Sequence, residues 1–187
     1  MRVNKGLMIA ATFDPTKRTS LITVADMCRK IEENSISLPL YQRDISWTLQ
    51  KCIDLLNYQL WGKAPVSPIS INVINTVDSA VPQVSFIDRE IISTIERGQY
   101  SVVDGQQRLT TNYKAYCNHD DFRNIVLDLG KGEFTEVRDS IRSNQIPVGI
   151  LLNKEDTKLF EYTKAKSALG SADVLSVLLQ VRSKMRN

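Results

Sequence analysis

The chain has 187 residues, of which 42% are apolar and 24% are charged, as is typical of a soluble globular protein with one ordinary hydrophobic core. Its formal net charge of +3 is too small to indicate a nucleic-acid partner by itself. Three cysteines without a CxxC pair argue against a disulfide framework and a structural zinc site, and favour reduced cytosolic thiols.

The first 19 residues show no helical or strand period. Their stretch GLMIAA holds about five apolar residues, fewer than the roughly 7–15 of a signal peptide and the roughly 20 that span a bilayer. We therefore expect a cytoplasmic protein without a membrane segment.

Residues 23–34 (TVADMCRKIEEN) are predicted to form a helix, because Thr23 can cap its start and apolar residues recur on one stripe. Residues 36–40 alternate apolar and polar side chains, as a strand does. Pro39 argues for an edge or terminal strand and against a central one. Residues 41–46 form a polar segment that follows this strand, which we call its polar exit.

A second helix is predicted from Thr48 to a stop at Gly62. The elements expected next are a strand at 68–74, a third helix at 88–98 between Asp88 and Gly98, and a strand at 100–104. The apolar spacing after Gly105 indicates a helix that begins within GQQR. A strand therefore turns directly into a helix at this point.

The remaining chain is expected to form a strand at 123–129, a short helix at 135–144, a strand at 146–152 and two helices in 153–187. This alternation predicts a compact α+β domain in residues 1–150 and a C-terminal helical appendage in residues 151–187. The basic last helix is interpreted as docked on the core. A DNA-contacting tail, and a partner-docking helix that would form a homo-oligomer, are the alternatives.

Residues 100–111 (YSVVDGQQRLTT) contain the strand-to-helix turn, and a helix N-terminus is a natural anion site. Gly105 permits close approach of a ligand, and Arg108 offers a planar fork of donors for phosphate oxygens. Gln106 and Gln107 can read sugar or base edges. Asp104 could hold a divalent cation or orient a water. The plain alternative is an Asp-Gly turn before a solvated helix start, with Thr110 as a local cap.

Together with LPLYQRDISW upstream, this stretch resembles the DGQQR-motif proteins, which form the N-terminal domain of GmrSD-type modification-dependent restriction systems. The similarity covers roughly residues 20–117. It implies a compact domain similar in fold to ParB and sulfiredoxin. It also implies nucleotide binding and hydrolysis in bacterial defence against phage DNA, with an NTP as substrate or ligand and Mg²⁺ or another divalent cation as cofactor.

The resemblance also implies which residues form the site. Those expected to bind the nucleotide are Gln42, Arg43, Gly105, Gln106, Gln107, Arg108 and Thr110. Those expected to be catalytic are Asp104, Gln107 and Arg108, with Asp104 also as the metal ligand. Two arginines from separate segments could clamp a polyphosphate and strengthen their contacts during phosphoryl transfer. Trp47 is interpreted as a core residue, with a base-stacking platform as the alternative.

Many relatives continue into an HNH nuclease domain, but His119 is the only histidine of this chain. The chain is therefore not expected to build a histidine-metal nuclease centre, and His119 is expected in a surface loop. DNA and a nuclease partner chain are the further partners considered. Gating of a DNA-directed activity competes with two alternatives: a non-catalytic ParB-like nucleotide- or DNA-binding module, and an inactive decoy or inhibitor of restriction.

Overall fold

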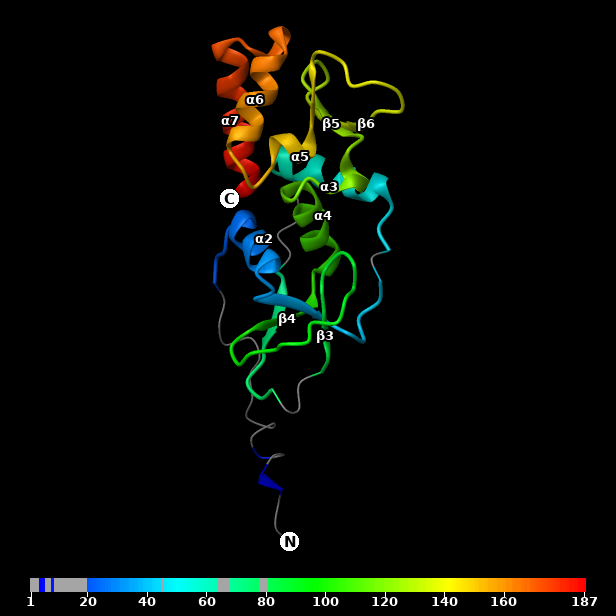
Figure 1. Cartoon of the computed structure of the whole chain (residues 1–187), viewed down its shortest axis with the longest axis vertical. Helices are drawn as coiled ribbons and strands as arrows, with labels where there is room; N and C mark the ends of the chain where they lie inside the picture. Colours follow the sequence, from blue (N-terminus) through cyan, green and yellow to red (C-terminus); the bar gives the residue numbers. More distant parts are fainter. Residues whose placement is uncertain (1–3, 6–7, 9–19, 45, 64–67, 78–80) are drawn as a thin grey trace.

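A computed structural model describes residues 4–5, 8, 20–44, 46–63, 68–77 and 81–187 (Figure 1). Two small β-sheets and several helices make up this part of the chain, which confirms the predicted α+β class. The apolar stretch at residues 6–11 lies outside the described residues, apart from Met8. Within the described ranges, no helix is both long enough and apolar enough to cross a bilayer.

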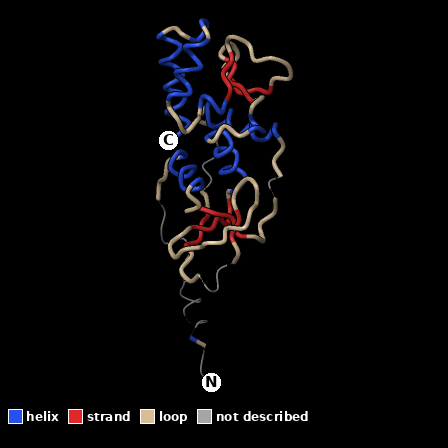
Figure 2. Tube along the Cα trace, in the orientation of Figure 1, coloured by secondary structure: helices blue, strands red, loops and turns tan. Residues whose placement is uncertain are grey.

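A four-stranded sheet occupies one end of the molecule (Figures 1 and 2). Its strands lie in the order β2-β4-β1-β3, with bounds β1 Ile36–Pro39, β2 Ser70–Val73, β3 Gln83–Val84 and β4 Tyr100–Asp104. β1 and β4 run parallel, with Ile36 opposite Tyr100, and the two outer strands are antiparallel to their neighbours. The parallel pair brings two distant segments of the chain, which contain LPLYQRDISW and YSVVDGQQRLTT, to the same edge of the sheet.

The prediction that Pro39 excludes a central strand is wrong, because β1 lies between β4 and β3. β4 pairs with Ile36 and Ser37, whereas β3 pairs with Leu38 and Pro39. The missing N–H of proline is therefore not required on the β4 side. Pro39 is also the last residue of the strand.

Three helices differ in their position relative to this sheet. Their bounds are α2 Val24–Glu32, α3 Leu49–Leu60 and α4 Gln106–Tyr116. α2 packs against this sheet, α4 extends from it, and α3 packs against β6 (Glu133–Glu136) of the second sheet. Thr23 caps α2 as predicted, and Thr48 caps α3 in the same way, because each hydroxyl accepts a hydrogen bond from the backbone N–H three residues later. α4 follows β4 after Gly105 alone, which confirms the predicted strand-to-helix turn.

The other end of the molecule contains a three-stranded antiparallel sheet and the C-terminal helices (Figure 1). The strands lie in the order β6-β5-β7, with bounds β5 Ile125–Asp128, β6 Glu133–Glu136 and β7 Gln145–Pro147. The helices are α5 Val148–Leu151, α6 Thr157–Ala165 and α7 Ala172–Arg186, with short 3₁₀ turns η1 Asp120–Phe122 and η2 Ser167–Leu169.

Three predicted elements are wrong, and tertiary pairing explains each one. Residues 88–98 form no helix, because Ile91 bridges Val84 and the N–H of Ile92 donates to the Gln83 carbonyl. Residues 135–144 form no helix, because Thr135 belongs to β6 and pairs with β5. Residues 146–152 are only partly a strand, since β7 ends at 147 and α5 follows at once.

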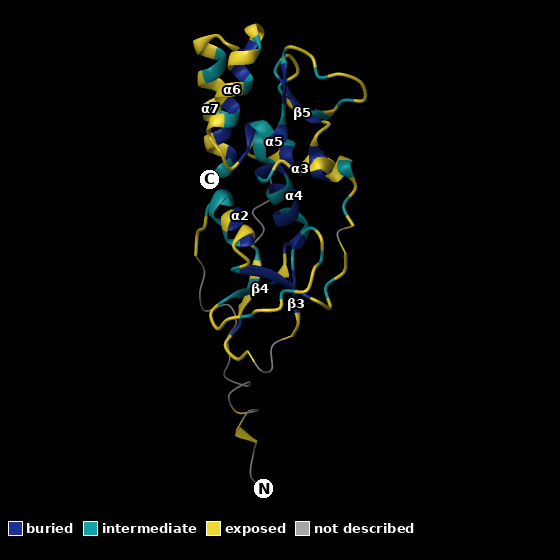
Figure 3. Ribbon diagram, in the orientation of Figure 1, coloured by how far each residue is buried: buried dark blue, intermediate teal, exposed yellow. Residues whose placement is uncertain are grey.

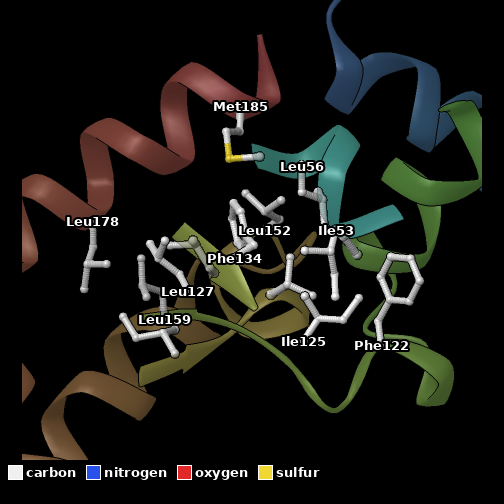
Figure 4. Packing of buried hydrophobic residues seen from close by; sticks show 14 of the residues in the cluster. Ile53, Leu56, Phe122, Ile125, Leu127, Phe134, Leu152, Leu159, Leu178 and Met185 are labelled. Atoms are coloured by element: carbon white, nitrogen blue, oxygen red, sulfur yellow. The ribbon is translucent and has the colours of Figure 1, made fainter. Parts of the chain in front are cut away.

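The buried apolar residues form two clusters. The smaller cluster lies between the four-stranded sheet, α2 and the start of α4, and consists of Met27, Ile31, Ile36, Leu38, Val84, Phe86, Val102 and Leu109. The larger cluster combines α3, the end of α4, the three-stranded sheet and the C-terminal helices. Figure 4 labels its residues Ile53, Leu56, Phe122, Ile125, Leu127, Phe134, Leu152, Leu159, Leu178 and Met185. α4 contributes Leu109 to one cluster and Ala115 to the other, and it lies between them (Figure 3).

The last helix docks on the core, as predicted. Leu178 and Met185 are buried in the larger cluster. The guanidinium of buried Arg182 donates to the Leu151 carbonyl at 2.5 Å and to the Asn153 carbonyl at 2.6 Å, and it also pairs with Asp156. The division of the chain at residue 150 stays a prediction.

Candidate functional site

The two sequence segments that carry the candidate residues meet at the end of β4. The side-chain amide of Gln42 donates to the backbone carbonyls of Val102 at 2.8 Å and Val103 at 2.7 Å. This contact joins residues about 60 positions apart, across the parallel β1–β4 pair. The polar exit of β1 therefore runs alongside the end of β4 and the start of α4.

The two glutamines of the motif strengthen the same junction. The Gln106 amide nitrogen donates to the Arg43 carbonyl at 3.3 Å, and the Gln107 amide oxygen accepts the Trp47 backbone N–H at 3.3 Å. All three glutamine amides of the site thus bind protein backbone. We refer to these three contacts, from Gln42, Gln106 and Gln107, as the amide tethers.

Gly105 is required both by its conformation and by the space around it. Its φ of +95° lies in the left-handed region, which is costly for other residues. A Cβ atom placed there would lie 2.4 Å from Cδ1 of Ile69. Because Gly105 is the N-cap and has no side chain, no side-chain hydrogen bond caps α4. The first N–H groups and the positive end of the helix dipole therefore converge at this tip.

Asp104 and Arg108 lie on either side of that glycine. Oδ2 of Asp104 is 3.8 Å from Nη2 of Arg108, which also donates to the Pro68 carbonyl at 3.1 Å. The Asp104 carboxylate is mostly exposed, whereas the Arg108 side chain is mostly buried. The arginine is thus held by the protein beside the helix tip, and the carboxylate faces solvent.

Asp104 would be a single protein ligand for a metal ion. In the described part of the chain, no group of three or more His, Cys, Asp or Glu residues is arranged to hold an ion. Mg²⁺ commonly binds through one or two carboxylates together with substrate phosphates. The residues present therefore fit an ion that is shared with a bound polyphosphate.

Two arginines flank the polar exit of β1. The Arg43 side chain is exposed, and its backbone carbonyl accepts a hydrogen bond from the Gln106 amide. Arg89 is anchored: its Nη2 donates to the Gln42 carbonyl at 2.6 Å, and its Nε lies 3.3 Å from Asp44. Its other terminal nitrogen, Nη1, is buried and has no hydrogen-bond partner among the described residues.

Sequence reasoning missed Arg89. The helix expected at 88–98 includes Arg89 but gives it no role in the site. In the structure its φ is +58°, an uncommon value for a residue with a side chain. No local pattern signals this role, because it depends on a contact with a segment more than 40 residues earlier.

Thr110 lies one helical turn after the tip. It is 1% exposed, and its Oγ1 is buried without a hydrogen-bond partner among the described residues. Thr110 and Trp47 both line a cavity of about 300 Å³ that does not include Arg43 or Arg108. Trp47 is half-buried and packs against the larger cluster, which is consistent with the interpretation as a core residue.

The remaining candidates are structural. His119 caps η1, where its Nδ1 accepts the Asp121 N–H at 3.2 Å. Cys28 and Cys52 are buried. Burial raises the pKa of the Cys28 thiol to about 12 and also raises the pKa of Cys52. Both remain neutral thiols near pH 7, which does not favour nucleophilic chemistry.

Comparison with known proteins identifies one family. The model for the GmrSD restriction endonuclease, N-terminal domain, matches residues 24–180, which is most of the chain. The matched range contains the amide tethers, the α4 tip, the smaller cluster and all of the larger cluster's buried residues except Met185. No curated protein matches the chain.

Proposed function

The chain belongs to the family of GmrSD restriction endonuclease N-terminal domains and is therefore part of a restriction system, and from this premise we propose that it binds and hydrolyses a nucleoside triphosphate at the α4 tip. The observation that carries the proposal is the junction of two distant segments around Gly105 by the amide tethers. A junction of this kind fixes the backbone around a helix N-terminus, which is what anion binding requires.

The polyphosphate would bind over Gly105. The absence of a side chain there lets phosphate oxygens approach the first N–H groups of α4. Arg108 is held beside the tip and supplies a planar donor fork. The exposed Arg43 closes on the phosphates from the other segment. Gln42, Gln106 and Gln107 support this site by fixing its backbone, and in this proposal they act on the nucleotide only through that backbone.

Hydrolysis would depend on Asp104 and Arg108. Arg108 stabilises the negative charge that spreads over the phosphoryl oxygens as the bond to the leaving group breaks. Asp104 either orients the attacking water or ligates the divalent cation. Mg²⁺ would be held by Asp104 together with the phosphates and would supply positive charge to the phosphoryl group. Hydrolysis in turn gates a DNA-directed activity, for which a partner chain provides the nuclease centre.

Phosphate release tests this proposal. ATP, GTP, CTP and UTP would be supplied with Mg²⁺ to the wild type and to Asp104→Ala and Arg108→Ala. We expect turnover in the wild type and a loss of about 100-fold in each variant, as for removal of one charge-stabilising donor. Asp139→Ala and Arg97→Ala, both at exposed positions away from the α4 tip, are the matched controls and should keep wild-type rates.

Other outcomes assign the chain to a different class. Nucleotide binding without turnover in the wild type would indicate a non-catalytic binding module. Neither binding nor turnover would indicate a decoy or inhibitor. DNA binding that weakens with salt but is unchanged in Arg108→Ala would place the DNA surface elsewhere on the molecule.

A further inference from the structure

A cavity of about 300 Å³ lies against the side of α4. Its walls come from the segment before α3, from α3, from α4 and from η1. The residues used below are Trp47, Thr110, Thr111, Lys114, Asp121 and Phe122. The volume is at the small end of the range for ligand pockets, which runs from about 300 to 1,000 Å³.

The Thr110 hydroxyl is unusual among the buried threonines of the helices. The hydroxyls of Thr111 and Thr163 donate to the carbonyls four residues earlier, at 2.9 Å and 3.0 Å. Thr110 is just as buried, yet its Oγ1 has no partner within the described structure. A buried hydroxyl without a partner is costly. Thr110 lines the cavity, so a ligand group there would remove that cost once the hydroxyl turns toward it.

The cavity walls combine flat apolar surfaces with a charged pair. Trp47 and Phe122 contribute aromatic rings. The Lys114 ammonium pairs with Asp121 and lies 6.0 Å from the centre of the Phe122 ring. A hydrogen bond from Lys114 lowers the pKa of the Asp121 carboxyl, so it is a charged acceptor near neutral pH. A hydroxyl, an ammonium and a carboxylate between apolar walls suit a planar heterocycle with donors and acceptors at its edge.

The position of the cavity relates it to the α4 tip. Thr110 follows Gln106 by four residues, which is about 6 Å along a helix axis. The Trp47 backbone N–H is bonded to the Gln107 side chain, so this wall of the cavity is fixed by one of the amide tethers. A nucleotide with its phosphates at the tip could therefore place its base one helical turn further along.

We propose that this cavity holds the base of the nucleotide, with the Thr110 hydroxyl bonded to the base edge and Trp47 against the ring. This inference rests on the proposed function, because it concerns the same ligand. It adds a specificity site that is separate from the phosphate site.

The first test compares a nucleotide with inorganic tripolyphosphate, which has no base. Calorimetry would measure both affinities for the wild type and for Thr110→Val, using the tightest-binding member of ATP, GTP, CTP and UTP. We expect Thr110→Val to lose about tenfold in nucleotide affinity, the value of one hydrogen bond, with tripolyphosphate affinity unchanged. Thr163→Val, the same change at a buried helical site in α6, should alter neither affinity.

The second test uses fluorescence. The chain has two tryptophans, so Trp61→Phe leaves Trp47 as the only one. We expect the nucleotide to change the Trp47 emission and tripolyphosphate to leave it unchanged. Because Trp61 is exposed and lies outside the cavity lining, this variant should fold and bind as the wild type does.

The outcomes separate this inference from the proposed function. If the wild type binds tripolyphosphate, but Thr110→Val weakens neither ligand or both ligands equally, the base assignment is overturned and the phosphate site stands. An unchanged Trp47 emission on saturation with nucleotide would also overturn it. If the wild type binds neither ligand, the proposed function and this inference both fail.

Discussion

Gly105 joins β4 to α4 at a position where any other residue would be destabilising for two reasons, one conformational and one steric. The φ of +95° penalises every side chain, and the contact with Ile69 penalises even a methyl group. We expect Gly105→Ala to lower the free energy of unfolding by about 2–5 kcal/mol, the sum of about 1–2 for the left-handed conformation and about 1–3 for overpacking. Urea denaturation would measure it.

Gly98 provides the matched control for that prediction. Its φ of +96° is nearly the same, but a Cβ atom there would meet nothing within 4 Å. Gly98→Ala should therefore show only the conformational cost, about 1–2 kcal/mol. Equal losses in the two variants would show that the contact with Ile69 relaxes without cost.

Arg89 is predicted to stabilise the polar exit of β1 through its bonds to backbone carbonyls and not through its ion pair. The Asp44 partner is 89% exposed, so the ion pair contributes little. We expect Arg89→Ala to cost about 1.5–3 kcal/mol, as for hydrogen bonds from a charged donor, and Asp44→Ala less than about 1 kcal/mol. Thermal denaturation of both variants would distinguish the two contributions, and equal losses would contradict the prediction.

The sequence identified the motif residues but not the way in which their side chains are used. Asp104, Gly105 and Arg108 were recognised because strand, turn and helix signals coincide there. The binding of Gln42 and Gln106 to backbone was not foreseen, because their acceptors lie on the other segment. Arg89 was missed for the same reason: the residues that give it a role are distant in the chain.

At the scale of elements, Asp128 holds the three-stranded sheet together at the β5–β6 turn. Its carboxylate accepts hydrogen bonds from Gln145 of β7, from Asn144, and from the N–H groups of Gly130 and Lys131. The bond from Gln145, followed by those from the two N–H groups, lowers its pKa. The ionised carboxylate is therefore the form that the folded state favours.

Asp128→Asn should make stability less dependent on pH in acid. Because the folded pKa is lowered, the stabilisation is complete above the unfolded pKa of about 3.9 and is lost as the pH falls through the folded pKa. We expect the variant to be about 1–3 kcal/mol less stable at pH 7, and this difference to shrink below about pH 4. Urea denaturation at pH 7, 5 and 3 would measure it, with Asp139→Asn in the exposed loop as control. A difference that stays constant with pH would exclude the proposed role of the charge.

Local patterns predicted the helices better than the short strands. The sequence predicts α2 from a threonine cap and an apolar stripe, and α3 from an apolar stripe and the stop at Gly62. The hairpin of β5 and β6 was missed, although Gly130 and Gly132 surround its turn, because Thr135–Asn144 also reads as a helix with few apolar residues. Residues 88–98 carry good helix end signals, but pairing of Ile91 with Val84 outweighs them.

At the scale of the molecule, α4 connects the two clusters and should make unfolding cooperative. Leu109 packs with the smaller cluster and Ala115 with the larger one, so neither cluster keeps its full packing if the other unfolds. Trp47 packs against the larger cluster, and Trp61 follows α3. Trp61 thus reports on the larger cluster's end of the molecule, whereas Trp47 reports on the larger cluster and on the start of α4, where its N–H binds Gln107.

We therefore expect a substitution in the smaller cluster to be detected by the tryptophans. Leu38→Ala, at a fully buried site of β1, should cost about 2–5 kcal/mol and lower the urea midpoint seen by tryptophan fluorescence by the same amount as that seen by circular dichroism. A fluorescence midpoint equal to that of the wild type, with a separate early transition in circular dichroism, would show that the two ends unfold independently.

Because of the amide tethers, the DGQQR motif should not keep its shape when it is moved by itself into a peptide or another protein. A synthetic peptide of residues 100–116 would contain the whole DGQQR motif. It would lack the Arg43 carbonyl and the Trp47 N–H, which are the hydrogen-bond partners of Gln106 and Gln107. Without them its turn would sample many shapes in solution. Grafting this turn into another scaffold would therefore require residues 42–47 as well. The smallest unit that can be transferred consists of both segments.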